Sequence, residues 1–369
     1  MGGGAVQSMA SKRRIAVVSG SRADFGLLRP VLEAIQAEKA LALHLILTGT
    51  HLTNGTWADA ARAGFARALR VPMQQPHRIG RGADVEALGR GIEGLGQAFA
   101  RVHAQIVLVL GDRIEALAAA CAAHVGGIHL AHIHGGDRAE GVADEAMRHA
   151  ISKLAHIHLA ATAQSRRRLI RMGESPRWVF NVGSPAVDGL KAIRRPGQTP
   201  GPIIVMQHPI GASDACEARW MRATLDATRG RARVLMAPNG DPGSAGLRRA
   251  LRCSREPIVE HLARPEFLRM LMGAEALVGN SSAGLIEAAA LRVPCINIGP
   301  RQAGRQQAAN VVNCEYGVAN VRRALARATR LPLGRMRHPY GDGHAGRRIA
   351  RLLARLDLSR LPIRKRNTY

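Results

Sequence analysis

Short apolar runs alternate with segments of helical period along almost the whole chain, and this alternation leaves few folds open to it. In the first half, buried strands are predicted at Ile15–Val18, Leu43–Leu47, Ile106–Leu110, Ile128–Ala131 and Ile157–Ala161. Helices are predicted between them at 24–38, 84–103, 113–124, 142–154 and 163–172. Strands and helices that alternate in this way favour a parallel sheet covered on both faces.

The alternation restarts after residues 194–202 (RRPGQTPGP), which we interpret as a linker because proline and glycine there oppose both helix and sheet. Beyond it, strands are predicted at Ile203–Gln207, Arg233–Met236, Glu275–Val278 and Cys295–Ile298, and helices at Asp214–Thr228, Ser282–Leu291 and 344–356. The sequence therefore predicts an α/β protein with two Rossmann-like, doubly wound domains that face a cleft. The expected boundaries are a flexible tail at 1–13, an N-terminal domain at 14–190, a C-terminal domain at 203–342, and a C-terminal helix and tail at 343–369.

Two common nucleotide-binding signatures are absent from the sequence. No G-x-G-x-x-G follows the first predicted strand, and no G-x-x-x-x-G-K-[ST] occurs anywhere. These absences disfavour an NAD-dependent oxidoreductase and a P-loop ATPase.

The chain of 369 residues is strongly basic, with 53 Lys and Arg against 27 Asp and Glu and a formal net charge of +26. Such a charge raises the hypothesis of nucleic-acid binding. However, the arginines are spread along the whole chain, and aromatic residues make up only 3%, too few for base-stacking platforms. We therefore favour a compositional bias toward arginine, with part of the charge available to an anionic ligand such as a nucleotide.

Cysteine usage and hydropathy predict a reduced, cytoplasmic compartment. The five cysteines are far apart and none has C-x-x-C spacing, so neither a disulfide framework nor a zinc knuckle is expected. No apolar run reaches the ~18–20 residues of a membrane span, and the N-terminal residues do not have the pattern of a signal peptide. His132 and His134 alternate on one side of a predicted strand, but without a third ligand they predict no metal site.

Ligands of parallel sheets bind beyond the carboxyl ends of the strands, so residues that follow the strands are candidates for chemistry. After the first strand, Arg22 offers a cation and Asp24 is placed to cap the next helix, although an ordinary capped turn explains this segment as well. After the strand that ends at Leu110, Asp112 stands beside Arg113, where its carboxylate is placed either for proton transfer or for helix capping.

The stretch 131–149 has the densest group of polar residues. Gly135 and Gly136 follow two histidines and lead to Asp144 and Arg148, which share one face of a predicted helix. The other interpretation of Asp144 and Arg148 is an exposed ion pair that contributes little.

In the second half, His208 follows a strand, and residues 279–284 (GNSSAG) end a strand and open a predicted helix. Free N–H groups at such a helix start form a phosphate cradle. Glu287 lies one turn into this predicted helix, where it can accept hydrogen bonds from ribose hydroxyls, and Arg301 follows the next strand, where it is available to a diphosphate.

Taken together, these motifs resemble the UDP-N-acetylglucosamine 2-epimerases, and above all the hydrolysing branch that supplies sialic-acid-type sugars. The resemblance rests on residues 19–30 (SGSRADFGLLRP), 111–113 (GDR), 132–148 (HIHGGDRAEGVADEAMR), 149–158 and 279–301, in the family's order. It implies the two-domain glycosyltransferase-B fold, a UDP-sugar substrate, no metal or other cofactor, and a homo-oligomer, either dimer or tetramer.

The resemblance also implies roles for single positions. Asp112 and Asp144 match carboxylates implicated in acid–base chemistry, and Arg148, His208, His134 and Arg113 are further catalytic candidates. Contacts to the UDP-sugar are implied for Arg22, Asp24, Asn239, Gly279, Ser281, Ser282, Glu287 and Arg301. Several family members have glutamate where this chain has His134, so Asp137 or Glu140 is the alternative carrier of that role.

The implied reaction eliminates UDP from UDP-GlcNAc to give a 2-acetamidoglucal, and water then adds to release N-acetylmannosamine. The alternatives are a hydrolysing 2-epimerase of a UDP-2,4-diacetamido-2,4,6-trideoxy sugar of the legionaminic-acid type and a non-hydrolysing UDP-GlcNAc 2-epimerase. A retaining glycosyltransferase of the same fold and a nucleic-acid binder are the hypotheses from other classes.

Overall fold

The structure is a computed structural model that describes residues 12–76, 78, 80–140, 144–190 and 201–366. Its strands form two sheets: seven strands in the order β3-β2-β1-β4-β5-β6-β7, and six in the order β10-β9-β8-β11-β12-β13. Neighbouring strands run parallel, as in the pairs β1–β2, β4–β5, β8–β11 and β11–β12. The predicted class, α/β with two doubly wound parallel sheets, is therefore confirmed.

Packing divides the chain into two compact units. The first comprises Met1–Ile133, Lys153–His158 and Gly346–Tyr369, and the second comprises His134–Ser152 and Leu159–Ala345. Most of the predicted linker, residues 194–200, and most of the predicted N-terminal tail, residues 1–11, lie outside the described residues.

The strands of the first sheet coincide largely with the apolar runs of the sequence. They are β1 Arg13–Ser19, β2 Leu41–Thr48, β3 Leu69–Val71, β4 Ile106–Leu110, β5 His129–Ile133, β6 Ile157–Ala160 and β7 Val179–Asn181. In the sheet register, Ile15 of β1 lies opposite Leu43 on one side and Ile106 on the other. β1 and β4 bury most of their side chains, as expected for parallel strands with helices on both faces.

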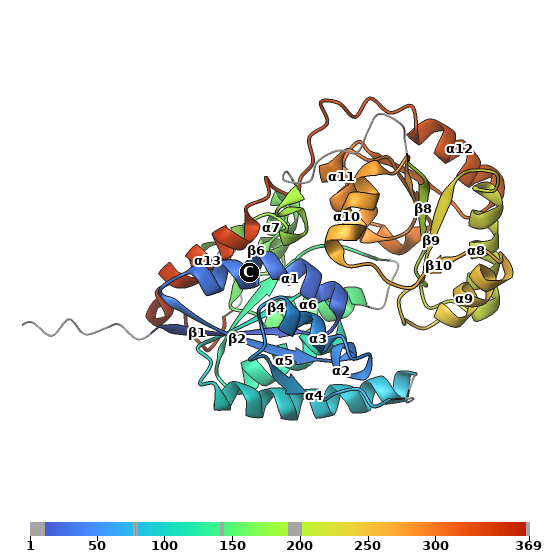
Figure 1. Ribbon diagram of the computed structural model, residues 1–369. Coiled ribbons are helices and arrows are strands. Elements are labelled where there is room, and N and C mark those ends of the chain that lie inside the picture. The colour runs from blue at the N-terminus through green and yellow to red at the C-terminus, as the bar shows by residue number, and fades with distance from the viewer. Residues whose placement is uncertain (1–11, 77, 79, 141–143, 191–200, 367–369) are drawn as a thin grey trace, which may run out of the picture. The chain divides into compact units, whose positions relative to one another are not determined.

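The first unit contains the helices α1 Arg22–Ala37, α2 Thr50–Thr53, α3 Trp57–Arg62, α4 Arg81–Arg101 and α5 Ile114–Val125. α4 and α5 pack together against one face of the sheet, and α1 covers the other face (Figure 1). The cap of α1 is Ser21, whose Oγ accepts a hydrogen bond from the Asp24 N–H at 3.2 Å. The expectation that Asp24 caps this helix was wrong, because Asp24 lies inside the first turn.

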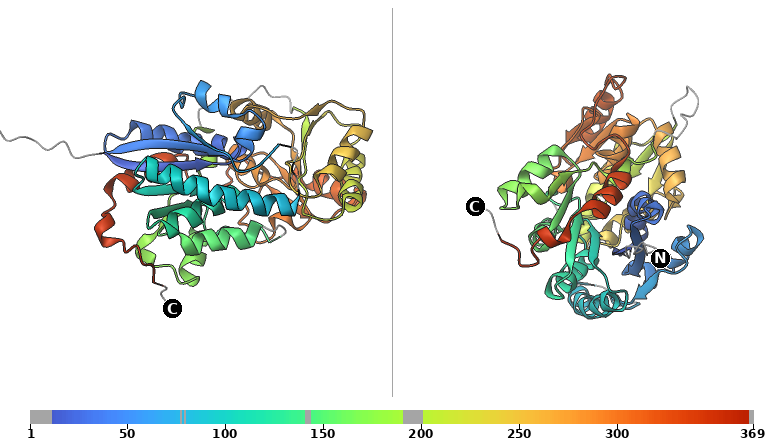
Figure 2. Two further views of the ribbon diagram at one scale, coloured as in Figure 1. Left: turned by 90° about the horizontal axis from the view of Figure 1, so that it is seen from below. Right: turned by 90° about the vertical axis from the view of Figure 1, so that its left-hand side faces the viewer.

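The C-terminal helix α13, Ala345–Arg355, packs against α1 and β1 of the first unit. Gly346 approaches α1 so closely that a Cβ atom there would lie 2.5 Å from Pro30 O. Arg13 of β1 donates to the carbonyl oxygens of Leu353 and Ala354. Figure 2 shows this segment in red beside the blue N-terminal strand and helix. Residues more than 300 positions apart in the sequence therefore share one unit.

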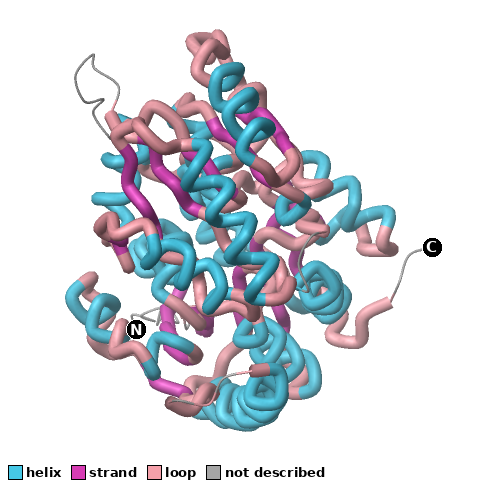
Figure 3. The backbone as a smooth tube through the Cα atoms, turned by 90° about the vertical axis from the view of Figure 1, so that its right-hand side faces the viewer, coloured by secondary structure: helices cyan, strands magenta, loops and turns pink. Residues whose placement is uncertain are grey.

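The second unit contains the second sheet, with β8 Ile203–Met206, β9 Arg233–Met236, β10 Ile258–Val259, β11 Leu277–Gly279, β12 Cys295–Ile298 and β13 Val311–Cys314. Its helices are α7 Ala163–Arg171, α8 Asp214–Ala227, α9 Ser244–Cys253, α10 Arg264–Gly273, α11 Glu287–Leu291 and α12 Val318–Ala328, together with most of α6, Asp144–Leu154. α8 packs against α9 and α12, whereas α10 packs against α11. Figure 3, seen from the side of α8, α9 and α12, shows helices in front of the strands. A buried core joins both layers, and it includes Val205, Met221, Leu247, Ile296 and Val321.

The structure differs from the helix predicted at Ser282–Leu291. A short 3₁₀ turn occupies Ser282–Gly284, and regular helix begins only at Glu287. The reason is local: the Ser281 Oγ accepts from the Ala283 N–H at 3.3 Å, and the tight i→i+3 turn follows directly.

Candidate functional site

The first predicted cation, Arg22, is paired with a carboxylate of its own unit. Its Nε lies 2.7 Å from Asp59 Oδ2 of α3, and Asp59 also pairs with Arg62. Arg22 is about one-third exposed. The side chain therefore keeps access to solvent at the start of α1 while its orientation is set by α3.

The carboxylate of Glu115, which was not predicted from the sequence, is buried near Asp24. Glu115, in the first turn of α5, is only 2% exposed; its Oε1 accepts from Gln74 Nε2 at 2.7 Å, and its Oε2 lies 3.4 Å from Arg113 Nε. Burial raises the pKa of Asp24 to about 6, Arg113 opposes this rise, and the neighbouring charge of Glu115 adds to it. Gly20 makes room for Glu115, because a Cβ atom at position 20 would lie 2.6 Å from Glu115 Cγ. The signal in the sequence was an acidic residue two positions after Arg113.

Asp112 lies in the turn between β4 and α5, where Gly111 has a φ of +78°. The N-cap residue of α5 is Arg113, whose own side chain makes no capping hydrogen bond, so Asp112 lies one residue before the N-cap position. His132 is fully buried on β5, and its Nε2 lies 2.7 Å from Gly111 O. His132 therefore supports the turn that carries Asp112.

In the second unit, His134 occupies a special backbone position and a buried polar network. β5 ends at Ile133, and His134 has a φ of +65°, so His132 and His134 do not continue as neighbours on one side of a strand. Nδ1 of His134 lies 2.8 Å from Asp137 Oδ2, and Nε2 lies 2.9 Å from Ser184 Oγ. The other oxygen of Asp137 accepts from Ser165 Oγ at 2.6 Å.

Asp137 is ionised at neutral pH. Burial by itself would raise the pKa of this carboxyl, but His134, Arg305 and the Ser165 hydroxyl together lower it to about 2. Gly136 is required beside it, because its φ is +74° and a Cβ atom would lie 2.5 Å from Ser165 O. Among the described residues, no group of three or more His, Cys, Asp or Glu side chains is arranged to hold a metal ion.

Arg148 lies inside the protein, at 2% exposure. Its Nη1 lies 2.7 Å from Glu145 Oε2 and 3.3 Å from Asp137 O. The interpretation of Arg148 as half of an exposed ion pair was therefore wrong. Asp144 is the first residue of α6, but its side chain lies outside the described part of the structure.

His208 is fixed by two asparagines beyond the end of β8. Its backbone N–H donates to Asn280 Oδ1 at 2.7 Å, and Asn280 Nδ2 donates back to His208 O at 2.8 Å. The Asn239 N–H donates to His208 Nδ1 at 3.2 Å. Burial and then the charge of Arg301 lower the pKa of His208 to about 3. The imidazole is therefore neutral and carries its proton on Nε2.

Arg301 lies next to this group, in the 3₁₀ turn Pro300–Gln302 after β12. Its Nη1 lies 3.3 Å from Asn280 O, and Gln302 Nε2 donates to the same oxygen at 3.0 Å. Asn280 is therefore the residue that joins His208 and Arg301. His208 and Arg301 were candidates from the sequence, whereas Asn280 was not, although it lies within the GNSSAG motif.

The predicted phosphate cradle is largely closed by internal hydrogen bonds. The N–H groups of residues 283–286 all donate to atoms of Ser281 or Ser282. Glu287 is 5% exposed and pairs with Arg264, whose Nη1 lies 3.0 Å from Glu287 Oε1. The N–H groups of residues 283–286 are therefore not free for a phosphate, because the 3₁₀ turn and the first turn after it use them.

The packing of neighbouring strands explains why residue 279 is a glycine. A Cβ atom at this position would lie 2.0 Å from Met206 O on the neighbouring strand β8. The close approach of two parallel strands therefore requires glycine here.

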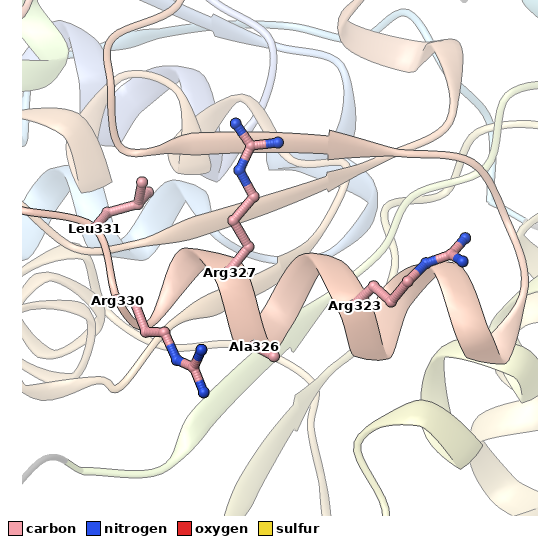
Figure 4. A pocket seen from close by; sticks show the side chains of 5 residues that line it. All are labelled: Arg323, Ala326, Arg327, Arg330 and Leu331. Carbon is pink, nitrogen blue, oxygen red and sulfur yellow. The ribbon is translucent and has the colours of Figure 1, made fainter.

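A separate arginine-lined hollow lies on α12. Figure 4 shows Arg323, Arg327 and Arg330 extending around it, with Ala326 and Leu331 completing the lining. None of the residues predicted for the site lines this hollow. Of the helices that the structure describes, none combines the length and the apolar character needed to span a bilayer.

The two doubly wound parallel sheets define the glycosyltransferase-B fold. The crystal structure of UDP-GlcNAc 2-epimerase from Neisseria meningitidis bound to UDP-GlcNAc has the same fold: the TM-score is 0.77 at 18% identity, over 92% of this chain and 99% of that chain.

Similarity in sequence identifies the family of the chain within this fold. The family model described as UDP-N-acetylglucosamine 2-epimerase matches residues 33–354, and the chain belongs to this family. The hydrolysing UDP-N,N'-diacetylbacillosamine 2-epimerase of Legionella pneumophila is 32% identical, over 97% of this chain and 100% of that protein. The UDP-N-acetylglucosamine 2-epimerase of Neisseria meningitidis serogroup B is 31% identical, over 86% of this chain and 88% of that protein. The family predicted from the motifs is therefore confirmed.

Proposed function

We propose that the chain is a hydrolysing 2-epimerase of a UDP-linked 2-acetamido sugar, which converts the UDP-sugar and water to UDP and the free C2-epimeric sugar. The observation that carries this proposal is the similarity to the hydrolysing Legionella enzyme along 97% of the chain and the whole of that protein. With UDP-GlcNAc the product is N-acetylmannosamine; with UDP-N,N'-diacetylbacillosamine it is the 2-epimer of the 2,4-diacetamido sugar. In either case the product is a precursor for a sialic-acid-type sugar.

The proposed reaction breaks the C2–H bond and the C1–O bond to UDP, and then forms a C1–O bond to water and a new C2–H bond. A base removes the C2 proton, the C1–O bond breaks, and UDP leaves with the bonding electrons to give a 2-acetamidoglucal. Water then adds to C1, and an acid returns a proton to the opposite face of C2. We assign these proton transfers to Asp112 and Asp144, because carboxylates on different strand-end loops can serve opposite faces of a sugar ring.

The leaving diphosphate needs positive charge and hydrogen-bond donors. We propose that Arg301, Arg22 and Arg113 supply charge, and that neutral His208 supplies an Nε2–H donor, since its pKa of about 3 excludes the imidazolium form near pH 7. Asp24, Asn239, Gly279, Ser281, Ser282 and Glu287 are proposed to contact the rest of the UDP-sugar. Glu287 would do so with one oxygen already paired to Arg264, which fixes the direction of the other.

The experiment is to incubate the purified protein with UDP-GlcNAc, and separately with UDP-N,N'-diacetylbacillosamine, in D₂O without an acceptor, and to follow both by NMR. We expect UDP and a free sugar that is epimeric and deuterated at C2, with the faster substrate identifying the specificity. A UDP-linked epimer without release of UDP would indicate a non-hydrolysing enzyme instead. No turnover of either substrate, with transfer only after an acceptor is added, would contradict the proposal in favour of a glycosyltransferase.

The proton-transfer roles have their own test. Asp112→Asn and Asp144→Asn should each lower kcat by about 100-fold or more while the Kd of UDP changes little, because proton transfer contributes about 10²–10⁴-fold. Asp226→Asn is the matched control, since Asp226 is an exposed partner of Arg229. Near-normal turnover in either site variant would remove that residue from the mechanism.

A further inference from the structure

Three consecutive carbonyl oxygens in the loop after β5 accept hydrogen bonds from three different arginines. Gly136 O accepts from Arg168 Nη1, Asp137 O from Arg148 Nη1 at 3.3 Å, and Arg138 O from Arg305 Nε at 3.3 Å. The three donors come from α7, from α6 and from the segment after β12. We refer to Arg148, Arg168 and Arg305 as the arginine clamp.

The clamp holds the segment that carries the buried His134–Asp137 pair. A loop that leaves a strand has no ladder partner for its carbonyl groups, and each buried carbonyl needs a donor. A guanidinium provides a charged donor, which makes a stronger and more directional hydrogen bond than a neutral one. The carboxylate of Asp137 is anchored from its other side by His134 and Ser165. The backbone and the side chain of Asp137 are therefore fixed independently.

Arg305 joins this loop to the one that contains Arg301. Besides the Arg305 contact, the Glu140 N–H donates to Ala303 O at 3.1 Å. Gly304, with a φ of +76°, lies so close that a Cβ atom would be 2.9 Å from Arg138 Nε. Two loops about 165 residues apart in the sequence are thus joined by one backbone–backbone hydrogen bond and by the Arg305 side chain.

Arg148 pairs with Glu145 and also lies near the positive charges of the other two arginines of the clamp and of Arg301. Burial lowers the pKa of Arg148, and the nearby charges of Arg305, Arg168 and Arg301 lower it further. A diphosphate at Arg301 would reduce this mutual repulsion.

We propose that Arg168 and Arg305 are positioning residues for catalysis: they fix the loop that carries His134 and Asp137, and Arg305 couples this loop to the diphosphate bound at Arg301. The proposal rests on the proposed function, which supplies the UDP-sugar. Neither residue was among the candidates from the sequence.

The test compares Arg305→Met, Arg305→Lys and Arg168→Met with the wild type. We expect Arg305→Met and Arg168→Met to lower kcat by about 10–100-fold, since a misplaced catalytic group costs about that much, while the Kd of UDP changes less than about three-fold. Arg305→Lys keeps the charge and should recover part of kcat. Arg327→Met on α12 removes the same charge away from the clamp and is the matched control with unchanged kcat (Figure 4).

Hydrogen exchange of the amides of residues 134–140, with and without UDP, supplies a readout that does not depend on turnover. In the wild type we expect UDP to slow this exchange; in Arg305→Met the exchange should be faster without UDP, and UDP should no longer slow it. If the wild type turns over no UDP-sugar but Arg305→Met still loosens the loop, the proposed function fails and the clamp stands. Wild-type kcat and unchanged exchange in both Met variants would overturn the clamp.

A variant that keeps every charge provides a test that remains available if Arg305→Met does not fold. Gly304→Ala introduces a Cβ atom near Arg138 Nε in a left-handed backbone position. We expect it to lower kcat in the same direction as Arg305→Met, with the Kd of UDP again nearly constant. Full activity in Gly304→Ala, together with full activity in Arg305→Lys and Arg168→Met, would contradict the proposal even if Arg305→Met does not fold.

Discussion

Gly279 is the last residue of one strand, and His208 follows the end of the neighbouring strand; a neighbouring segment determines the surroundings of each. Gly279 ends β11, where the carbonyl of Met206 on β8 leaves no space for a Cβ atom. His208 follows β8, and the neighbouring loop residue Asn280 fixes its backbone from both directions. The sequence placed both residues at the right edge of the sheet. The space at Gly279 and the backbone hydrogen bonds of His208 depend on atoms from segments about 70 residues away.

The first prediction concerns Gly279. Gly279→Ala should lower the free energy of unfolding by about 3 kcal/mol or more, because a Cβ atom 2.0 Å from Met206 O forces β8 and β11 apart. Gly240→Ala is the control, since no atom lies within 4 Å of its Cβ position, and it should change stability by less than about 1 kcal/mol. Urea unfolding of both variants measures the difference. A stable Gly279→Ala that loses only UDP binding would show that this glycine serves the ligand instead.

At the scale of elements, two histidines bind the C-terminal segment of the first unit, and a third stacks on one of them. His129 Nε2 lies 2.9 Å from Leu361 O, and His156 Nε2 lies 3.0 Å from Ile363 O. The rings of His124 and His156 stack with centroids 5.7 Å apart. Nδ1 of His156 accepts from the Leu130 N–H at 3.1 Å, so His156 can keep both hydrogen bonds only when it is neutral.

The second prediction concerns this attachment in acid. Burial above all lowers the pKa of His156 from its ordinary 6.5 to about 4, while the bond to Ile363 O opposes this shift and His129, His124 and Lys365 add to it. Below pH 6.5 the unfolded chain binds a proton that the folded chain refuses, so stability falls as the pH falls from about 6.5 to 4. Between about pH 7 and 5 His156 alone should account for a loss of up to about 2 kcal/mol.

Urea unfolding at these two pH values checks the prediction. His156→Gln should lose less stability than the wild type on acidification, whereas His344→Gln, which removes an exposed histidine, should lose as much as the wild type. An equal loss in all three proteins would show that His156 does not control this response.

At the scale of the whole molecule, charge is the dominant feature. A net charge of +26 repels itself in the folded state, and salt screens this repulsion. Exposed ion pairs such as Arg29–Glu33 and Arg229–Asp226 oppose the effect only weakly, because each contributes little at the surface. The arginines around the hollow on α12 form a local concentration of this charge.

Because repulsion outweighs the exposed ion pairs, we expect salt to stabilise the protein. The melting temperature should rise by a few degrees as NaCl increases from about 10 to 150 mM, because the screening length falls to about 8 Å over this range. A variant with Arg323, Arg327 and Arg330 all changed to Gln should show a smaller rise. A melting temperature that falls with salt would mean that ion pairs outweigh the repulsion.

The sequence predicted many of the elements with a clear apolar pattern and missed the shortest strands and three helices. Runs such as Ile106–Leu110 and the stripe of α1 carry enough apolar residues for their period to be recognised. β3 and β10 have three and two residues, too few to show any period, and they were missed. The helices α9, α10 and α12 were also missed, and the helix expected at Ser282 begins at Glu287. Pairing within a sheet, and not local pattern, defines such short strands.

The residues of the candidate site also fall into those that the sequence pattern indicates and those that it does not. Residues that follow strands, such as Asp112, His208 and Arg301, could be named as candidates because parallel strands end at one edge of a sheet. Glu115, Asn280, Arg264 and Arg305 were missed because each is defined by a partner far away in the chain, up to 167 residues for Arg305 and Arg138.

The sequence by itself determined the α/β class, the strand-end positions of the candidate residues and the family, since periodicity and motif order are written along the chain. The tertiary structure alone decided that His208 is neutral, that Asp137 is charged, that Arg148 is buried, and that three arginines hold one loop. The physical reason is that hydrophobic periodicity acts between near neighbours, whereas desolvation, charge and hydrogen bonding depend on whichever segments folding brings within a few ångströms.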